Sequence, residues 1–168
     1  MLQTLVSLDE YLSNTWHPDV DYVEGRIEER NLGEKEHGKL QLRIAFLLKR
    51  LRTVVPFIET RLRISADRYR VPDVCAYDVE PEESVFTQPP VLCVEILSPE
   101  DRMSRIMKVV QDYLSMGVPT VWVLDPLEKK AYVADASAGF REVTGEIAAR
   151  DQRMVFTLEQ IFSGEDIF

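Results

Sequence analysis

Two acidic residues lie inside apolar segments that have the character of buried strands. Asp73 is in RVPDVCAY, residues 70–77, and Glu95 is in VLCVEIL, residues 91–97. A carboxylate that is buried without a partner is strongly destabilised or takes up a proton. If the two strands are neighbours and both side chains point to one face, their carboxylates converge. One of them must then be protonated, or a cation must lie between them.

Convergent carboxylates are typical ligands of a hard divalent ion. Magnesium is usually held by one or two carboxylates, with water and substrate phosphate completing its shell, and it activates water for attack on a phosphodiester. The alternative is structural: Asp73 would make a turn contact, and Glu95 would form a buried ion pair with Arg61 or Arg63. The residues alone leave both possibilities open.

The elements that position these acids alternate between helical and extended patterns. Leu40, Ile44 and Leu51 belong to one apolar stripe, which predicts a helix from Glu34 to the residue before Pro56. Apolar residues on both alternating faces place 71–77 and 91–97 in the middle of a sheet. Further strands are expected at 20–24, 26–31, 57–65, 120–125, 129–134 and near 140–143, and short helices at 7–14 and 156–162.

A second long helix is expected directly after Glu95. Ser98 followed by Pro99 is a typical helix start, and Gly117 is a typical end. Such a start would place the positive end of the helix dipole beside the acids, where it suits a phosphate. His37 lies three residues before Leu40, so it points to the buried side of its helix; we expect a packed histidine unless its ring reaches Asp73.

Length and composition limit the class of protein. With 168 residues, one α/β domain spanning 1–168 is expected. Two cysteines, Cys75 and Cys93, both in apolar stretches, indicate free packed thiols, and a zinc site is not expected. We find neither a basic region followed by an apolar segment at the N-terminus nor an apolar run of about 20 residues, so a cytoplasmic protein is expected.

The net charge of −9 argues against a protein that coats nucleic acid without specificity. The charge is uneven, because residues 39–70 hold nine basic side chains and only two acidic ones. This basic segment either faces a polyanion or forms ordinary solvated surface. Tyr69, among its arginines, could stack on a base, although strand surface is the simpler interpretation.

Several motifs, in order, resemble a known family. They are E-H on the first long helix, R-x-P-D-V, V-E-I-L-S-P-E-D-R, D-Y-L-x-M-G-V and V-W-V-L-D-P, between about Asp21 and Pro126. This series is similar to the bacterial family of restriction endonucleases within the PD-(D/E)XK nuclease superfamily. The resemblance implies a restriction-endonuclease-like α-β-β-β-α-β core, a mixed sheet flanked by helices, with an N-terminal hairpin. It also implies Mg²⁺ (or Mn²⁺) held by Asp73 and Glu95, with Glu36 as a further acid.

The lysine of the family pattern is displaced. The superfamily places it at the position of Leu97, and the related bacterial family at the position of Val109. The nearest lysine is Lys108, one residue or about 100° around the helix, which turns it toward solvent. Lys108 is the candidate catalytic lysine if the helix start is irregular. The alternatives are Lys35, Lys39 or Arg102, or an impaired site.

Two functions follow from these observations. The first is a magnesium-dependent endonuclease that hydrolyses DNA phosphodiester bonds, in which Asp73 and Glu95 position the ion and a cation stabilises the transition state. Nucleic acid is the expected partner, with a homodimer as a further expectation from the resemblance. The second is a catalytically impaired module on the same scaffold that binds nucleic acid or protein.

Overall fold

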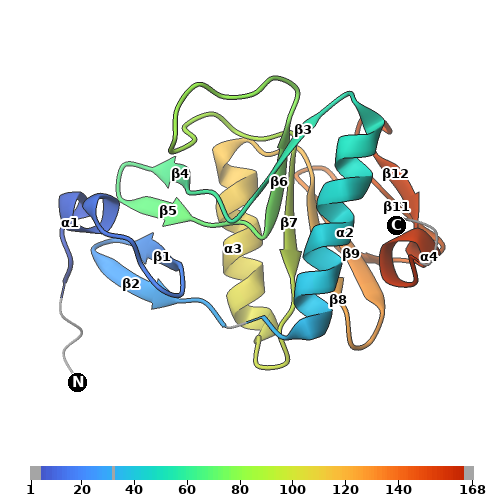
Figure 1. Ribbon diagram of the computed structural model, residues 1–168, viewed down its shortest axis with the longest axis horizontal. Coiled ribbons are helices and arrows are strands. Elements are labelled where there is room, and N and C mark those ends of the chain that lie inside the picture. The colour runs from blue at the N-terminus through green and yellow to red at the C-terminus, as the bar shows by residue number, and fades with distance from the viewer. Residues whose placement is uncertain (1–4, 32, 165–168) are drawn as a thin grey trace.

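The computed structural model describes residues 5–31 and 33–164. Its largest element is a six-stranded sheet built from β3 (Val55–Ile58), β6 (Val74–Tyr77), β7 (Leu92–Ile96), β8 (Val121–Asp125), β9 (Lys130–Asp135) and β10 (Gly139–Val143). The strand order is β10-β9-β8-β7-β6-β3, and the sheet is mixed because β7 and β8 run parallel while the other neighbours are antiparallel (Figure 1). The expected mixed α/β fold is confirmed.

Two long helices, α2 (Lys35–Leu51) and α3 (Met103–Met116), cover opposite faces of this sheet (Figure 1). Leu40, Ile44 and Leu48 of α2 pack in one core cluster with Val94 and other residues of its face. The side chains of Cys75 and Cys93 lie in the other cluster, against α3. Because side chains alternate along a strand, β6 and β7 are buried on both faces, as their sequences predicted.

A smaller sheet lies beside the central one and carries the N-terminal hairpin. Its order is β2-β1-β5-β4, formed by β2 (Arg26–Glu29), β1 (Val20–Val23), β5 (Arg68–Arg70) and β4 (Leu62–Ser65). Glu24 and Gly25 both have positive φ, of 50° and 80°, which suits a tight two-residue hairpin turn. The helix α1 (Leu8–Ser13) packs Tyr11 against tyrosines of β1 and β5.

The remaining elements close the C-terminal side. They are a two-stranded sheet, β11 (Glu146–Ala148) with β12 (Val155–Thr157), and the short helix α4 (Leu158–Phe162). The sequence analysis predicted α4 but missed both short strands. Cys75 and Cys93 are free and buried, as expected, and face each other across β6 and β7. No helix among the described residues is long and apolar enough to cross a membrane.

The predicted strand 57–65 is wrong as one unit. The chain leaves the central sheet after Ile58, and Glu59 has a φ of 47°, so the extended conformation is broken there. Residues 62–65 then pair in the smaller sheet. The predicted strand 71–77 is likewise shorter, because the central strand begins at Val74 and β5 ends at Arg70.

The predicted helix start at Ser98 is also wrong, since α3 begins at Met103. The Asp101 side chain accepts a hydrogen bond from the Ser98 backbone N–H at 2.7 Å, and the Asp101 N–H donates to the Ser98 carbonyl at 2.9 Å. These bonds hold 98–101 as a closed turn. The helix dipole therefore begins several residues beyond the place expected from the sequence.

Candidate active site

Asp73 lies just before β6, where three segments meet. Its side chain is buried, with 4% exposed, and both oxygens have partners. Oδ1 lies 2.5 Å from the Arg30 guanidinium. Oδ2 accepts the Ile96 backbone N–H at 2.7 Å and lies 3.3 Å from His37 Nε2. One carboxylate therefore joins the end of β7, the first turn of α2 and the segment after the hairpin.

Glu95, on β7, is the neighbour of Asp73 across the sheet. Val74 pairs with Val94 in the antiparallel register, and continuing this register by one residue places Asp73 opposite Glu95. Tyr113 on α3 donates its hydroxyl to Glu95 Oε1 at 2.5 Å. The other oxygen, Oε2, has no hydrogen-bond partner within 5–31 and 33–164.

Burial and the negative charge of Asp73 raise the pKa of Glu95 to about 8, although Arg30 and the Tyr113 hydroxyl oppose this shift. At neutral pH the Glu95 carboxyl therefore holds its proton most of the time. Arg30 and His37 both lie against Asp73, so Glu95 has no directly paired cation among the described residues and a proton neutralises it instead.

Two basic side chains stabilise Asp73, and one of them was missed by the sequence analysis. Burial alone would lower the pKa of Arg30, but the charges of Asp73 and Glu95 raise it above its usual value. Burial would also lower the pKa of His37, whereas its hydrogen bond to Asp73 and the charge of that group raise it. His37 meets the condition set for a role at the site, because its ring reaches Asp73. No local pattern around Arg30 marks it.

The structural alternative for Glu95 named the wrong arginines. Arg61 lies over the Tyr11 ring, 4.7 Å from its centroid, and donates to the carbonyls of Leu12 and Asn14 at the surface. Arg63 is exposed on β4. The cation beside the two acids is Arg30, and it pairs directly with Asp73 rather than with Glu95.

The remaining candidates lie elsewhere. Lys108 is exposed and lines a hollow that neither Asp73 nor Glu95 borders. Glu36 is half-exposed on the first turn of α2, with Lys39 at 3.6 Å. Val109 is buried, one helical turn before Tyr113, so the family's lysine position lies on the same face of α3 as the tyrosine that contacts Glu95. The structure brings the two central acids together but not these three side chains.

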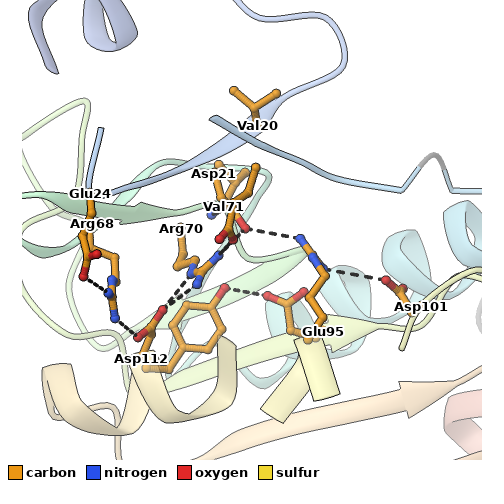
Figure 2. Close-up of polar contacts among 12 residues, drawn as sticks. Val20, Asp21, Glu24, Arg68, Arg70, Val71, Glu95, Asp101 and Asp112 are labelled. Carbon is orange, nitrogen blue, oxygen red and sulfur yellow. Dashed lines mark hydrogen bonds and ion pairs between the residues drawn. The ribbon is translucent and has the colours of Figure 1, made fainter. Parts of the chain in front are cut away.

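Two arginines of the basic segment are paired with acids inside the molecule. Arg70 is buried and pairs with Asp21 at 2.9 Å and with Asp112 at 2.7 Å, while Arg68 also pairs with Asp112 at 2.7 Å (Figure 2). Glu95 lies beside this network (Figure 2). Residues 39–70 therefore do not form one basic face, and their charges link β1 and β5 to α3.

Three hollows adjoin one another beside Asp73 and form what we call the groove, and Glu95 borders none of them. The first, of about 480 Å³, is bordered by Asp73 and shares Arg30 with the second, of about 670 Å³. The second shares Glu100 with the third, of about 370 Å³, which reaches Lys108. Asn31 borders all three. A long ligand could follow this groove past Asp73.

The donor set suits a hard divalent ion that keeps most of its water. Asp73 and Glu95 offer carboxylate oxygens side by side, and Glu95 Oε2 is open. No group of three or more His, Cys, Asp or Glu side chains arranged for a metal occurs within the described ranges. Water and a substrate phosphate would have to complete the shell, and Arg30 would have to release Asp73 Oδ1. The two acids fit magnesium better than a metal that requires a full protein cage.

Comparisons with known proteins agree with this architecture. A solved structure, of a putative nuclease belonging to DUF820 from Anabaena variabilis ATCC 29413, superposes with a TM-score of 0.83 at 21% identity. The match covers 94% of this chain and 98% of that one, and at this identity it shows the fold alone. No curated protein matches the chain. The family model Uma2, described as a putative restriction endonuclease, matches residues 8–163, which include both central acids. The chain therefore belongs to this family of restriction endonuclease-like proteins.

Proposed function

We propose that this protein is a magnesium-dependent endonuclease that hydrolyses DNA phosphodiester bonds, with Asp73 and Glu95 as the metal ligands. The observation that carries the proposal is the buried pair itself. Two acids face each other at one end of the sheet, and the pKa of Glu95 is raised to about 8. A structural arrangement would pair each acid with its own cation, whereas here Arg30 and His37 both lie against Asp73, and Glu95 retains affinity for a proton.

The protein's own residues would supply positioning and charge. The bound ion would polarise the phosphate and lower the pKa of the attacking water. The N–H of Ile96 and the ring of His37 hold the Asp73 carboxylate in place, and Tyr113 orients Glu95. Arg30 lies at the wall between the first two hollows, where its guanidinium can bind the non-bridging phosphate oxygens as charge develops on them.

In this arrangement Arg30, rather than Lys108, would stabilise the negative charge that develops on the phosphate in the transition state. Lys108 is assigned instead to binding outside the reacting phosphate, because it borders only the third hollow. Glu36 remains a candidate whose role an E36Q variant decides. Cleavage of both strands by two copies of the chain is a further part of the proposal, which sedimentation velocity with and without a DNA duplex tests.

The experiment is cleavage of supercoiled plasmid and of single-stranded RNA in Mg²⁺, Mn²⁺ or EDTA. Wild type should nick or linearise the plasmid only with the divalent ion. Asp73→Ala and Glu95→Gln should each lose activity by at least about a hundred-fold, the scale of losing a group that stabilises the transition state. Glu142→Gln is the matched control, because it removes an acid from the exposed surface of β10. Cleavage that survives both site variants would contradict the proposal.

A second function has one specific observation in its favour. Arg30 occupies an oxygen of Asp73, and the family's lysine position holds Val109. The same scaffold could then bind nucleic acid without turnover. Val109→Lys separates the two possibilities, because it places an amine on the face of α3 that carries Tyr113. If wild type is inactive and the variant cleaves, the chain is an enzyme that has lost its lysine.

A further inference from the structure

The third hollow of the groove contains two cations that have no acidic partner among the residues that the structure describes. Arg102 and Lys108 are exposed and line this hollow of about 370 Å³. Neither has an ion pair or a side-chain hydrogen bond within residues 5–31 and 33–164. Both charges are therefore available to an anionic ligand.

The other arginines of this hollow are already neutralised. Arg105 lies 3.4 Å from Asp21 and 3.7 Å from Asp101. Arg70 is buried against Asp21 and Asp112. Among the described residues that line this hollow, the charged side chains without an ion pair are therefore Arg102, Lys108 and the acid Glu100.

The hollow is connected to the proposed active site. Asn31 borders all three hollows, and its side-chain amide donates to Asp101 at 2.8 Å, which fixes the wall between the hairpin side and the segment before α3. Glu100 lines both the second and the third hollow. A chain that passes Asp73 and Arg30 can therefore continue along the groove to Lys108.

We propose that Arg102 and Lys108 form a binding site for a backbone phosphate of the nucleic acid, on one flank of the phosphate that lies at Asp73 and Glu95. The inference rests on the proposed function. It states that the strand leaves the phosphate at Asp73 on the side of Arg102 and Lys108 and follows the groove there. Two cations in an open hollow suit phosphates by charge and carry no base preference. In the basic segment 39–70, by contrast, Arg68 and Arg70 are already paired with acids.

A substitution of Glu100 tests the proposal in the opposite direction, because it should strengthen the binding of nucleic acid. Glu100 is an exposed acid with no ion pair within the described ranges, and it lies at the junction of two hollows. On the path of a polyanion its charge repels the strand. Removing it should therefore strengthen binding, while removing Arg102 or Lys108 should weaken it.

The experiment is fluorescence anisotropy of a labelled DNA duplex in EDTA, with wild type, Arg102→Gln, Lys108→Gln, the double variant and Glu100→Gln. Lys49→Gln is the matched control, because this exposed lysine lies in the last turn of α2 and borders none of the three hollows. Each lost cation should weaken binding roughly five-fold and lower the slope of log K against log salt by about 1. Glu100→Gln should bind several-fold more tightly.

The outcomes separate this inference from the proposed function. If Arg102→Gln and Lys108→Gln bind like Lys49→Gln, the subsite is refuted, and plasmid cleavage that depends on Asp73 still supports the nuclease. If wild type binds no nucleic acid at any salt concentration and cleaves none, the phosphate subsite and the proposed nuclease function are both refuted. Since all four residues are exposed, thermal unfolding curves that match wild type establish that the variants are folded.

Discussion

Replacing Glu95 by Gln should change how the stability of the protein depends on pH. The variant keeps the size of the side chain and its acceptor for the Tyr113 hydroxyl, but it cannot ionise. In wild type, folding raises the pKa of Glu95 from an ordinary 4.5 to about 8, because the carboxyl is buried beside Asp73. Below pH 4.5 the group is protonated in both the folded and the unfolded state, so it adds nothing to the pH dependence of stability. As the pH rises toward 8, only the unfolded state releases the proton, so wild type loses stability.

The size of the effect follows from the two pKa values. Between them, each pH unit lowers the free energy of unfolding by about 1.4 kcal/mol. From pH 5.5 to 7.5 wild type should therefore lose roughly 2–3 kcal/mol relative to Glu95→Gln, and the loss should level off above the pKa of about 8. Groups away from the site titrate in both proteins, so the pH dependence of the difference reports Glu95 together with its close neighbour Asp73.

Urea unfolding at pH 5.5, 6.5 and 7.5 in EDTA measures this difference. The fluorescence of Trp122, which is fully buried in the central sheet, reports unfolding. Glu142→Gln should track wild type at every pH, because that acid is exposed. A gap between wild type and Glu95→Gln that stays constant across the pH range would refute the reasoning, since Glu95 would then titrate like an ordinary surface acid.

Three further predictions concern residues around the site. Arg30→Met should tighten the binding of Mn²⁺ at least about ten-fold in calorimetry, because it removes a positive charge from Asp73. Equal or weaker binding would contradict the idea that Arg30 competes with the metal ion for this carboxylate. Arg70→Met should destabilise the protein by about 3–5 kcal/mol in urea, because it leaves Asp21 and Asp112 buried with less positive charge, and a loss below about 1 kcal/mol would contradict this. Gly117→Ala should lower stability by about 1 kcal/mol or more, because φ is +105° at the end of α3, and an unchanged melting temperature would show that the position tolerates a side chain.

The central sheet and its acids could be read from the sequence because their signals are local. Asp73 and Glu95 are conspicuous as charges inside apolar runs, and apolar residues on both faces of those runs correctly placed the two strands in the middle of the sheet. That the two strands are neighbours was only a condition of the hypothesis, and the structure meets it. The apolar stripe of α2 likewise predicted that His37 faces inward. These features depend only on periodicity and burial.

The partners of the acids could not be predicted, because long-range contacts determine them. Arg30 reaches Asp73 across 43 positions in the sequence, and nothing in its own neighbourhood distinguishes it from Arg61 or Arg63. The start of α3 was misplaced for a related reason. Ser98 and Pro99 look like a helix start, but the Asp101 side chain closes a turn on Ser98 and delays the helix to Met103.

The position of Arg30 has a consequence for how the site is assembled. Both acids belong to the central sheet or its end, whereas the arginine follows a strand of the smaller sheet, which Arg70 and Asp21 tie to α3. Any movement of the hairpin away from α3 would carry the guanidinium with it and leave the carboxylates exposed to a competing cation. The position of the peripheral hairpin can therefore control whether Asp73 and Glu95 are open to a cation, although the hairpin supplies neither of the acids.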